Sequence, residues 1–450
     1  MKTANIPQEL SQIPSRLSQK GSARFWLVAL ATGITTGICA ILLTRLLEWV
    51  QRLVWGGDGT HILEAAQHAD NWHHIAALVG AGVITGVGQL VLVTLTSGNG
   101  IDVTSAIWFS AGRLPFLRTL GSATLSEIIV GMGASLGREG GPKQAGAVMA
   151  NFFCDRAALS DEQRRLLVAC GAGAGMAAAY GVPIGGALFS LEVLRGMLAL
   201  RLVLPALFIA VVATLVSWMG LPNHPIYRIP TYSSSVGALS LSLVIGLVVG
   251  VAAVGYIRTI SWADRNRPRG WLRFVLPIIV LGALGAVSIR FPQLLGNGRD
   301  ISEHAFNGAV TSGALLCCLV VLKPLATIAC IRSGAPGGLF TPSLTFGALL
   351  GALIGWITLQ FSPEIGLALP AFVGASAMVA ATTQGPISAA ILMIEFSGYD
   401  RTSIGPCLVG IISATLVSRT IEPRSIYDAR LGEEEVTAKL AAREQQQATA

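Results

Sequence analysis

The sequence predicts an all-α, polytopic integral membrane protein, built from two homologous halves of inverted topology with many broken or tilted helices. Composition is the first reason: 52% of the 450 residues are hydrophobic, only 12% are charged, and the mean hydropathy is +0.64. Soluble proteins carry about 25% charged residues. Apolar stretches recur along the whole chain, and motifs of the first half return in the second. The 52 glycines lie within these stretches, where they suit close helix packing and helices that break inside the bilayer.

The first two apolar spans, at about 25–44 and 75–96, are long enough to cross a bilayer. A transmembrane helix needs about 20 apolar residues. Several later stretches are shorter and interrupted by glycine or proline, which predicts helices that enter the membrane partway and end at a central site. These stretches lie near 121–137, 166–192, 202–219, 236–257, 274–290, 312–331, 344–360, 366–381, 386–396 and 403–418.

Basic residues mark the segments expected in the cytoplasm. The polar lead before the first span is too long for a signal peptide and carries only positive charge near that span. The loop 258–273 contains five arginines with Trp262 and Trp271, a pattern typical of a cytoplasmic loop against anionic headgroups rather than of a voltage sensor. The net charge of +7 is therefore no sign of nucleic-acid binding. The basic residues of the lead are Lys2, Arg16, Lys20 and Arg24.

Neither histidine nor cysteine forms a familiar metal pattern. Four histidines lie between the first two spans, and no carboxylate or cysteine completes a ligand set, so a solvated loop is the favoured interpretation over metal binding or pH sensing. The seven cysteines lack CxxC spacing and are expected to be small buried hydrophobic residues. We expect no metal and no cofactor. The histidines are His61, His68, His73 and His74.

An internal repeat divides the chain. Residues 183–192, Pro-Ile-Gly-Gly-Ala-Leu-Phe-Ser-Leu-Glu, align with 386–395 at an offset of 203 residues, and the segments from Gly171 and Gly374 fit the same offset. Gly133 aligns with Gly334 at an offset of 201 residues. Matches at nearly one offset predict two homologous halves whose broken helices meet at the membrane midplane.

Three glycine-rich breaks carry the chemistry: 97–102, 137–142 and 334–342. The second holds Arg138 and Glu139 among glycines, within an apolar region where charged side chains are costly and usually functional. Free N–H groups and helix N-termini can replace the water of a small anion without trapping it by a full charge. Glu139 is then the group whose charge a proton can switch. The pattern predicts an anion pathway with a glutamate gate.

These breaks resemble the three signature motifs of the CLC family of chloride channels and chloride/proton exchangers. The family patterns GSGIP, GREGP and GxFxP correspond to residues 98–102, Gly-Asn-Gly-Ile-Asp, residues 137–141, Gly-Arg-Glu-Gly-Gly, and residues 338–342, Gly-Leu-Phe-Thr-Pro. The resemblance covers essentially the whole membrane region. It implies a CLC-type fold in a bacterial member without CBS domains, and a homodimer with one pathway in each subunit.

The resemblance also implies site residues. Glu139 matches the gating glutamate, whose carboxylate occupies the outer anion site and leaves it when protonated or displaced. The N–H groups of Leu339 and Phe340 match those that hold the central anion, and Tyr427 matches the tyrosine that closes the inner side. The anion-binding set implied by the motifs is Asn99, Gly100, Arg138, Glu139, Gly140, Leu339, Phe340 and Tyr427.

Three positions depart from the family patterns. Asn99 replaces the inner-gate serine, which leaves open a fluoride- or nitrate-preferring relative. Asp102 replaces a proline, and we expect it to cap a helix, although its charge could also repel an incoming anion. Gly141 replaces the proline of GREGP, which would loosen the first turn after the gate.

A further departure bears on proton coupling. Exchangers of the family typically carry a glutamate pair in which the second member relays protons; here Glu192 is followed by Val193, which cannot carry a proton. Glu192 is a candidate for proton uptake through water, or a structural carboxylate packed against Arg195 or capping a helix. Glu395, its repeat equivalent, is expected to be structural. For Arg138, the candidate counter-charges are Glu127 and Glu139 itself.

The sequence therefore predicts a passive chloride channel gated by Glu139, with a chloride/proton antiporter as the alternative. Without an HExxH, a P-loop or a Ser-His-Asp order, we expect no enzyme. The expected partners are chloride or other small anions, membrane lipids and a second copy of the chain, without nucleic acid. We expect a multi-pass protein of the bacterial inner membrane with both termini cytoplasmic. The predicted parts are a cytoplasmic N-terminal segment (1–24), a first membrane repeat (25–220), a second membrane repeat (221–427) and a short polar cytoplasmic tail (428–450).

Overall fold

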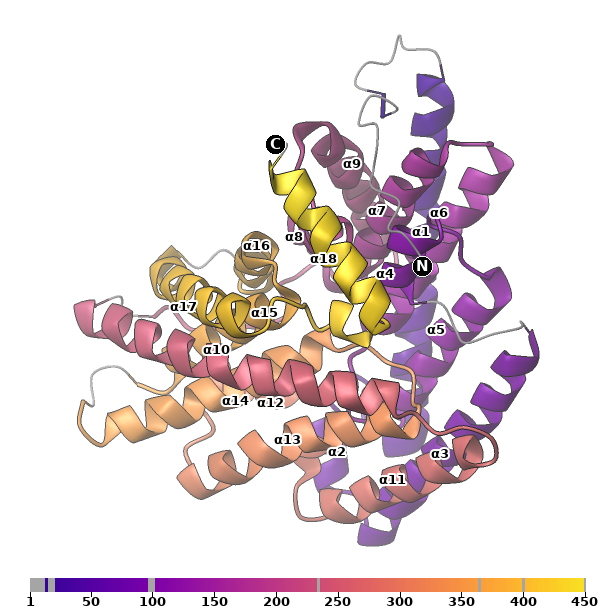
Figure 1. Cartoon of the computed structure of the whole chain (residues 1–450). Helices are drawn as coiled ribbons and strands as arrows, with labels where there is room; N and C mark the ends of the chain where they lie inside the picture. Colours follow the sequence, from indigo (N-terminus) through magenta and orange to yellow (C-terminus); the bar gives the residue numbers. More distant parts are fainter. Residues whose placement is uncertain are drawn as a thin grey trace.

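The described part of the computed structural model is helical, as predicted. It comprises residues 13–14, 21–95, 102–232, 235–362, 366–398 and 401–448. Within these ranges there is no strand beyond one isolated bridge, between Gly137 and Gly338. Figure 1 shows the helices crossing one another at many angles, with α18 lying across the face that carries the C-terminus.

The helices of the first part of the chain are α1 (Ser22–Trp55), α2 (Ile62–Gln67), α3 (Asn71–Leu95), α4 (Val103–Phe109), α5 (Phe116–Gly131), α6 (Gly140–Arg156), α7 (Asp161–Tyr180), α8 (Pro183–Phe189), the π-helical turn η2 (Ser190–Arg195) and α9 (Leu200–Ser217). Those of the second part are α10 (Val236–Arg265), α11 (Leu272–Ser288), the 3-10 turn η3 (Pro292–Leu294), α12 (Arg299–Phe306), α13 (Gly313–Ser333), α14 (Phe340–Leu359), α15 (Ala368–Thr383), α16 (Pro386–Phe396), α17 (Arg401–Ile421), the 3-10 turn η5 (Asp428–Arg430) and α18 (Glu433–Ala448).

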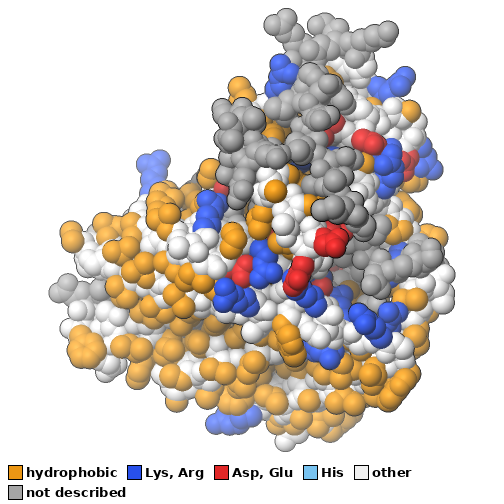
Figure 2. Space-filling model, viewed as in Figure 1, with side chains coloured by type: hydrophobic (Ala, Val, Ile, Leu, Met, Phe, Trp, Pro, Cys, Tyr) orange, Lys and Arg blue, Asp and Glu red, His pale blue; other side chains and the backbone are white. Residues whose placement is uncertain are grey.

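Seven helices of the described ranges are long and apolar enough to span a bilayer: α1, α3, α9, α10, α13, α14 and α17. Their outward faces carry large exposed apolar side chains, such as Leu90 of α3, Val251 of α10 and Leu416 of α17. Figure 2 shows apolar side chains spread over the lower and left parts of the visible face, whereas charged side chains gather across its middle. A chain with such surfaces is a polytopic membrane protein, as predicted.

Equivalent glycines place equivalent helices of the two parts in close contact. A Cβ on Gly146 of α6 would overlap the carbonyl oxygen of Gly171 of α7, and a Cβ on Gly347 of α14 would overlap that of Gly374 of α15. The two crossings are related by the sequence offsets of the repeat, 201 and 203 residues. Small residues at the crossing let the backbones approach, which is how helices pack tightly in a membrane.

The histidine region differs from the solvated loop that was predicted. Residues 62–67 form α2, and His74 lies in α3 with 3% of its surface exposed. Its Nδ1 is 2.9 Å from Ser288 Oγ and its Nε2 is 3.0 Å from Ala66 O. These contacts make His74 a buried link between helices. No group of three or more metal-ligating side chains exists in the ranges that the structure describes.

The arginine-rich segment is partly helical, because α10 continues to Arg265. Arg258 Nε lies 3.0 Å from Glu422 Oε2, and Arg265 Nη1 lies 2.6 Å from Glu433 Oε1. These two arginines therefore form ion pairs with the C-terminal segment, in addition to the predicted role at the membrane surface. Arg267 pairs with Asp264 of α10 at 2.6 Å. The polar tail predicted from residue 428 onward contains a helix, α18, in this structure.

Candidate anion pathway

The loops before α6 and α14 meet in the middle of the protein. Gly137 N donates to Gly338 O and Gly338 N donates to Gly137 O, both at 2.8 Å. The two glycines are 201 residues apart, the offset of the repeat, so the bridge joins equivalent positions of the two parts. Two of the three predicted glycine-rich breaks therefore converge. Of the third, only Asp102 lies within the described residues, and Asn99 and Gly100 lie outside them.

The carboxylate of Glu139 lies beside this bridge and is held by three donors. Oε1 accepts from the backbone N–H of Phe340 at 2.7 Å. Oε2 accepts from the hydroxyl of Thr341 at 2.9 Å and from the hydroxyl of Tyr180 at 3.1 Å. Phe340 is the first residue of α14, so the carboxylate also faces the positive end of that helix dipole. Hydrogen bonds to an ionised acceptor are the strong ones.

Glycine is required on both sides of this carboxylate. A Cβ at Gly137 or at Gly338 would overlap Glu139 Oε1. Glu139 itself is only 2% exposed. The bridge glycines therefore form the cradle into which the side chain fits, and they explain why the sequence has glycine at these positions of both motifs.

Arg138 does not pair with either predicted counter-charge. No carboxylate of a described residue lies within 4.0 Å of its guanidinium, so neither Glu127 nor Glu139 forms an ion pair with it. Its Cζ instead lies 5.0 Å from the centroid of the Tyr180 ring, a cation–π contact. Arg138 is only half-buried and lines a cavity. Arg138 therefore faces a cavity rather than a carboxylate.

That cavity, which we call the Arg138 cavity, has a volume of about 310 Å³. Its lining carries a net positive charge, because three arginines outnumber Glu48 and Glu303. Arg138 precedes Glu139 in the chain, and Tyr180 donates a hydrogen bond to it. Arg299 lies in the same wall, and Arg228, His61 and His224 lie around it. The cavity therefore reaches two residues next to Glu139.

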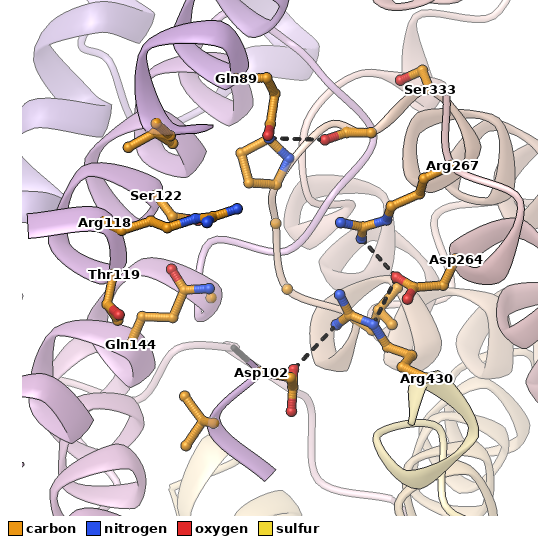
Figure 3. Close-up of a pocket in the computed structure, with 18 of the residues that line it drawn as sticks. Gln89, Asp102, Arg118, Thr119, Ser122, Gln144, Asp264, Arg267, Ser333 and Arg430 are labelled. Atoms are coloured by element: carbon orange, nitrogen blue, oxygen red, sulfur yellow. Dashed lines mark hydrogen bonds and ion pairs between the residues drawn. The ribbon is translucent and has the colours of Figure 1, made fainter. Parts of the chain in front are cut away.

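A second cavity, which we call the Tyr427 cavity, has a volume of about 370 Å³. Figure 3 shows Arg118 and Arg267 pointing toward each other across it, with the ion-paired Asp264 and Arg430 along one wall. Arg430 Nε lies 3.0 Å from Asp264 Oδ1. Three more residues line this cavity: Gly140, which follows Glu139; Leu339, which precedes Phe340; and Tyr427. Residues next to Glu139 thus line two separate cavities, with Arg138 and Tyr180 at one and Gly140 and Leu339 at the other.

Tyr427 and Asp102 lie together at the Tyr427 cavity. Tyr427 is 2% exposed and its ring centroid is 5.8 Å from that of Phe189. Asp102 is the N-cap of α4, and its Oδ1 accepts from Thr104 N at 2.7 Å, as predicted. Asp102 Oδ2 also lies 3.9 Å from Arg430 Nη1 (Figure 3), so its charge is offset beside the pathway.

Glu192 is a structural cap in this structure. Its Oε1 accepts from Ile387 N at 3.1 Å and its Oε2 from Ser388 N at 2.6 Å, at the start of α16. Arg195, the other predicted partner of Glu192, forms an ion pair with Glu162. Val193, the residue after Glu192, is 1% exposed and has no group that can titrate.

Three side chains of the site were not predicted. Thr341 occupies the second variable position of the GxFxP pattern, and Tyr180 ends α7 without belonging to any motif. Lys143 follows the GREGP-like break by one turn of α6 and lines the Tyr427 cavity. Only Thr341 had a signal in the sequence, because a threonine at the start of a helix can donate to an anion there.

Comparison with known proteins identifies the family of this chain. The family model described as voltage gated chloride channel matches residues 81–419. The voltage-gated ClC-type chloride channel ClcB of Escherichia coli O9:H4 (strain HS) is 31% identical over 398 residues, which cover 85% of this chain and 92% of that protein. The protein of the same name from Shigella flexneri is likewise 31% identical over 398 residues.

Solved structures share the fold. A slow cyanobacterial Cl⁻/H⁺ antiporter superposes with a TM-score of 0.76 at 22% sequence identity, covering 94% of this chain and 99% of that one. A CLC-type fluoride/proton antiporter superposes with a TM-score of 0.74 at 20% identity, covering 92% of this chain and 99% of that one. At these identities the likeness establishes the architecture, with its two related halves, and leaves the transported ion and the coupling open.

Proposed function

The chain belongs to the voltage-gated chloride channel (CLC) family of anion-transporting membrane proteins, and on that premise we propose that it is a passive chloride channel gated by Glu139. One observation carries the proposal: the Glu139 carboxylate occupies a place that a small anion would occupy. Its donors are the Phe340 N–H and the hydroxyls of Thr341 and Tyr180. Each of these can donate equally well to chloride.

The gate opens when the carboxylate leaves these donors. Protonation removes the charge that binds the side chain to three donors, and an incoming anion can then take the donors over. In the proposed pathway, Phe340 N–H and the neighbouring Leu339 N–H hold the anion, at the positive end of α14. Neutral donors bind weakly enough to release it, because none of them carries a full charge.

Both cavities support passage through the gate. Their cationic linings raise the local concentration of anions on each side of Glu139. Tyr427 is the proposed barrier at the other end, because it is buried and lines the cavity named after it. Asn99 and Gly100, which we expect at the same end, complete the proposed binding set. We propose that this cavity opens to the cytoplasm.

The channel is favoured over the antiporter because of Val193. It is buried and cannot carry a proton, and the adjacent carboxylate, Glu192, is engaged by two N–H groups at the start of α16. The relatives at 31% identity are named as channels, which agrees with this choice. Proton coupling would need another route from the Tyr427 cavity to Glu139.

We also propose that two copies assemble as a homodimer in a bacterial inner membrane, as the family resemblance implies. One chain alone contributes all three donors of Glu139 and both cavities. Each subunit therefore holds a complete pathway. Chemical cross-linking of the protein in its membrane, followed by mass measurement, tests the dimer.

The test of function is a flux assay on purified protein in liposomes under an imposed chloride gradient, with internal chloride and internal pH recorded together. Chloride movement without coupled proton movement is the expected result. Proton movement against its gradient, driven by chloride, would make the protein an antiporter. Liposomes without protein, and liposomes with the Tyr180→Phe variant, provide the leak and gate controls.

A further inference from the structure

Lys143 is a buried cation in the anion pathway that no family motif includes. It lies in the first turn of α6, four residues after Glu139, and its exposed fraction is 8%. The side chain lines the Tyr427 cavity together with Gly140, Leu339 and Tyr427. The ammonium thus lies next to the residues that separate this cavity from the gate.

The surroundings of Lys143 offset its charge only in part. Its Nζ lies 4.2 Å from the centroid of the Tyr427 ring, a cation–π contact. Asp102 and Glu139 are the carboxylates whose fields act on it, and Arg430 is an opposing cation. Among the described residues, however, no carboxylate lies within the 4.0 Å of an ion pair and no carbonyl accepts a hydrogen bond from the ammonium.

An ammonium in this situation has room and charge to bind an anion from the cavity. Burying a charge without a hydrogen-bonded partner is costly, and an aromatic face compensates less than a paired carboxylate does. Lys323 in α13 illustrates the usual solution, because its Nζ donates to Leu294 O at 2.9 Å and to Gly296 O at 3.0 Å. Lys143 has no such acceptors within the described ranges, and it faces a cavity whose other cations attract anions.

Building on the proposed function, we propose that the Lys143 ammonium binds the transported anion at the end of the Tyr427 cavity, below the gate, and sets the anion preference. The anion completes the coordination of the ammonium, and Tyr427 lies against the same group. A compact full charge produces a stronger field than backbone N–H groups do. Strong fields favour small anions over large, polarisable ones, so Lys143 favours chloride over nitrate and thiocyanate.

The experiment measures halide binding and flux together in Lys143→Met and Lys143→Arg. Binding is measured by calorimetry on purified protein in detergent, and bromide is located by its anomalous scattering in crystals. Lys143→Met is expected to weaken chloride binding by about tenfold or more, because one charge-assisted contact is lost. Lys143→Arg keeps the charge and is expected to stay within about threefold of wild type, with a changed nitrate-to-chloride permeability ratio.

Arg290→Met is the matched control. Arg290 also lies over an aromatic ring, that of Phe291, at 5.8 Å, but it belongs to neither cavity. It loses the same unit charge and is expected to leave chloride binding unchanged. Elution volume and thermal midpoint of each variant report folding, and if Lys143→Met does not fold, Lys143→Gln and the bromide position in wild-type crystals carry the test.

The outcomes separate this inference from the proposed function. Bromide density beside Lys143 Nζ, with weaker binding in Lys143→Met, supports the site. Unchanged chloride affinity and permeability ratios in Lys143→Met, or no bromide beside the ammonium in crystals that bind it elsewhere in the pathway, would overturn it. Wild-type protein that neither binds nor conducts chloride would instead refute the proposed function.

Discussion

Glu192 and Glu395 each cap the helix to which the other belongs. Glu395 of α16 accepts from Ile184 N at 3.1 Å and Gly185 N at 2.7 Å, in the first turn of α8. Glu192, in the turn that continues α8, accepts from the N–H groups at the start of α16 in the same manner. The two carboxylates are 203 residues apart, the repeat offset. Their exchange of caps is a two-fold relationship, and it ties the two parts of the chain together.

Replacing either cap is expected to destabilise the protein without changing transport. Glu192→Gln and Glu395→Gln each keep one acceptor oxygen but lose the charge near a helix N-terminus, which costs about 1 kcal/mol. The two losses are expected to be of the same order, since each carboxylate accepts from two N–H groups at a helix start. Thermal unfolding of purified protein in detergent measures them.

Glu434→Gln is the control for these two variants, because Glu434 is an exposed residue of α18. Chloride flux is measured in parallel. Lower flux in Glu192→Gln at unchanged stability would contradict the structural role and restore Glu192 as a proton-uptake residue.

Glu139→Gln is expected to remove the pH dependence of chloride flux. In wild type, protons release the carboxylate from three donors, so flux rises as pH falls. Glutamine is neutral at every pH and mimics the protonated gate, and at neutral pH its flux should exceed that of wild type by about tenfold, since each 1.4 kcal/mol of lost binding is one factor of ten. Flux through liposomes between pH 4.5 and 7.5 is the measurement. A variant that keeps the wild-type pH profile would show that Glu139 is not the gate.

Gly338→Ala is expected to open the gate by steric means. The added methyl group would overlap Glu139 Oε1, and this atom is the end of a flexible side chain that can move away. Flux at neutral pH should therefore approach that of Glu139→Gln, and the thermal midpoint should change little. Gly140→Ala is the comparison: there the methyl group meets the backbone of Gly338 at 2.7 Å, so lost stability is expected instead. If folded Gly338→Ala protein gates like wild type, the space left by Gly338 is not needed to hold Glu139 in the closed position.

The internal repeat predicted that broken helices of the two halves meet, and the structure joins the breaks 137–142 and 334–342 through Gly137 and Gly338. Spacing could not predict Tyr180, whose hydroxyl reaches Glu139 from 41 residues further along the chain, because only the packing of α7 against α6 places it there. The role of Arg138 was missed for a similar reason. A sequence shows that a charge lies in an apolar region, but the cavity that Arg138 faces is a property of the assembled helices.

Tyr180→Phe is expected to weaken the closed gate in part. It removes one of the three donors to Glu139, and a hydrogen bond to a charged acceptor contributes about 1.5–3 kcal/mol. The midpoint of the flux–pH profile should move toward higher pH, because two donors hold the ionised carboxylate less firmly than three. Tyr227→Phe is the control, since Tyr227 packs on the same Phe396 ring but is no donor to Glu139. Equal profiles for both variants would exclude Tyr180 from the gate.

His61 predicts a pH-dependent contribution to stability at the Arg138 cavity. Its contact with Asp300, at 3.4 Å, raises the pKa of the imidazole above 6.5, and this effect exceeds the opposing effect of partial burial. A raised pKa means that the folded protein holds the proton more tightly than the unfolded chain does. The stabilisation is therefore complete below about pH 6.5, the ordinary histidine value, and is lost as pH rises through the higher pKa of the folded state. Thermal midpoints of wild type and His61→Gln should differ most at pH 5.5 and converge at pH 8.5; a constant difference across this range would show that the imidazolium of His61 contributes nothing through Asp300.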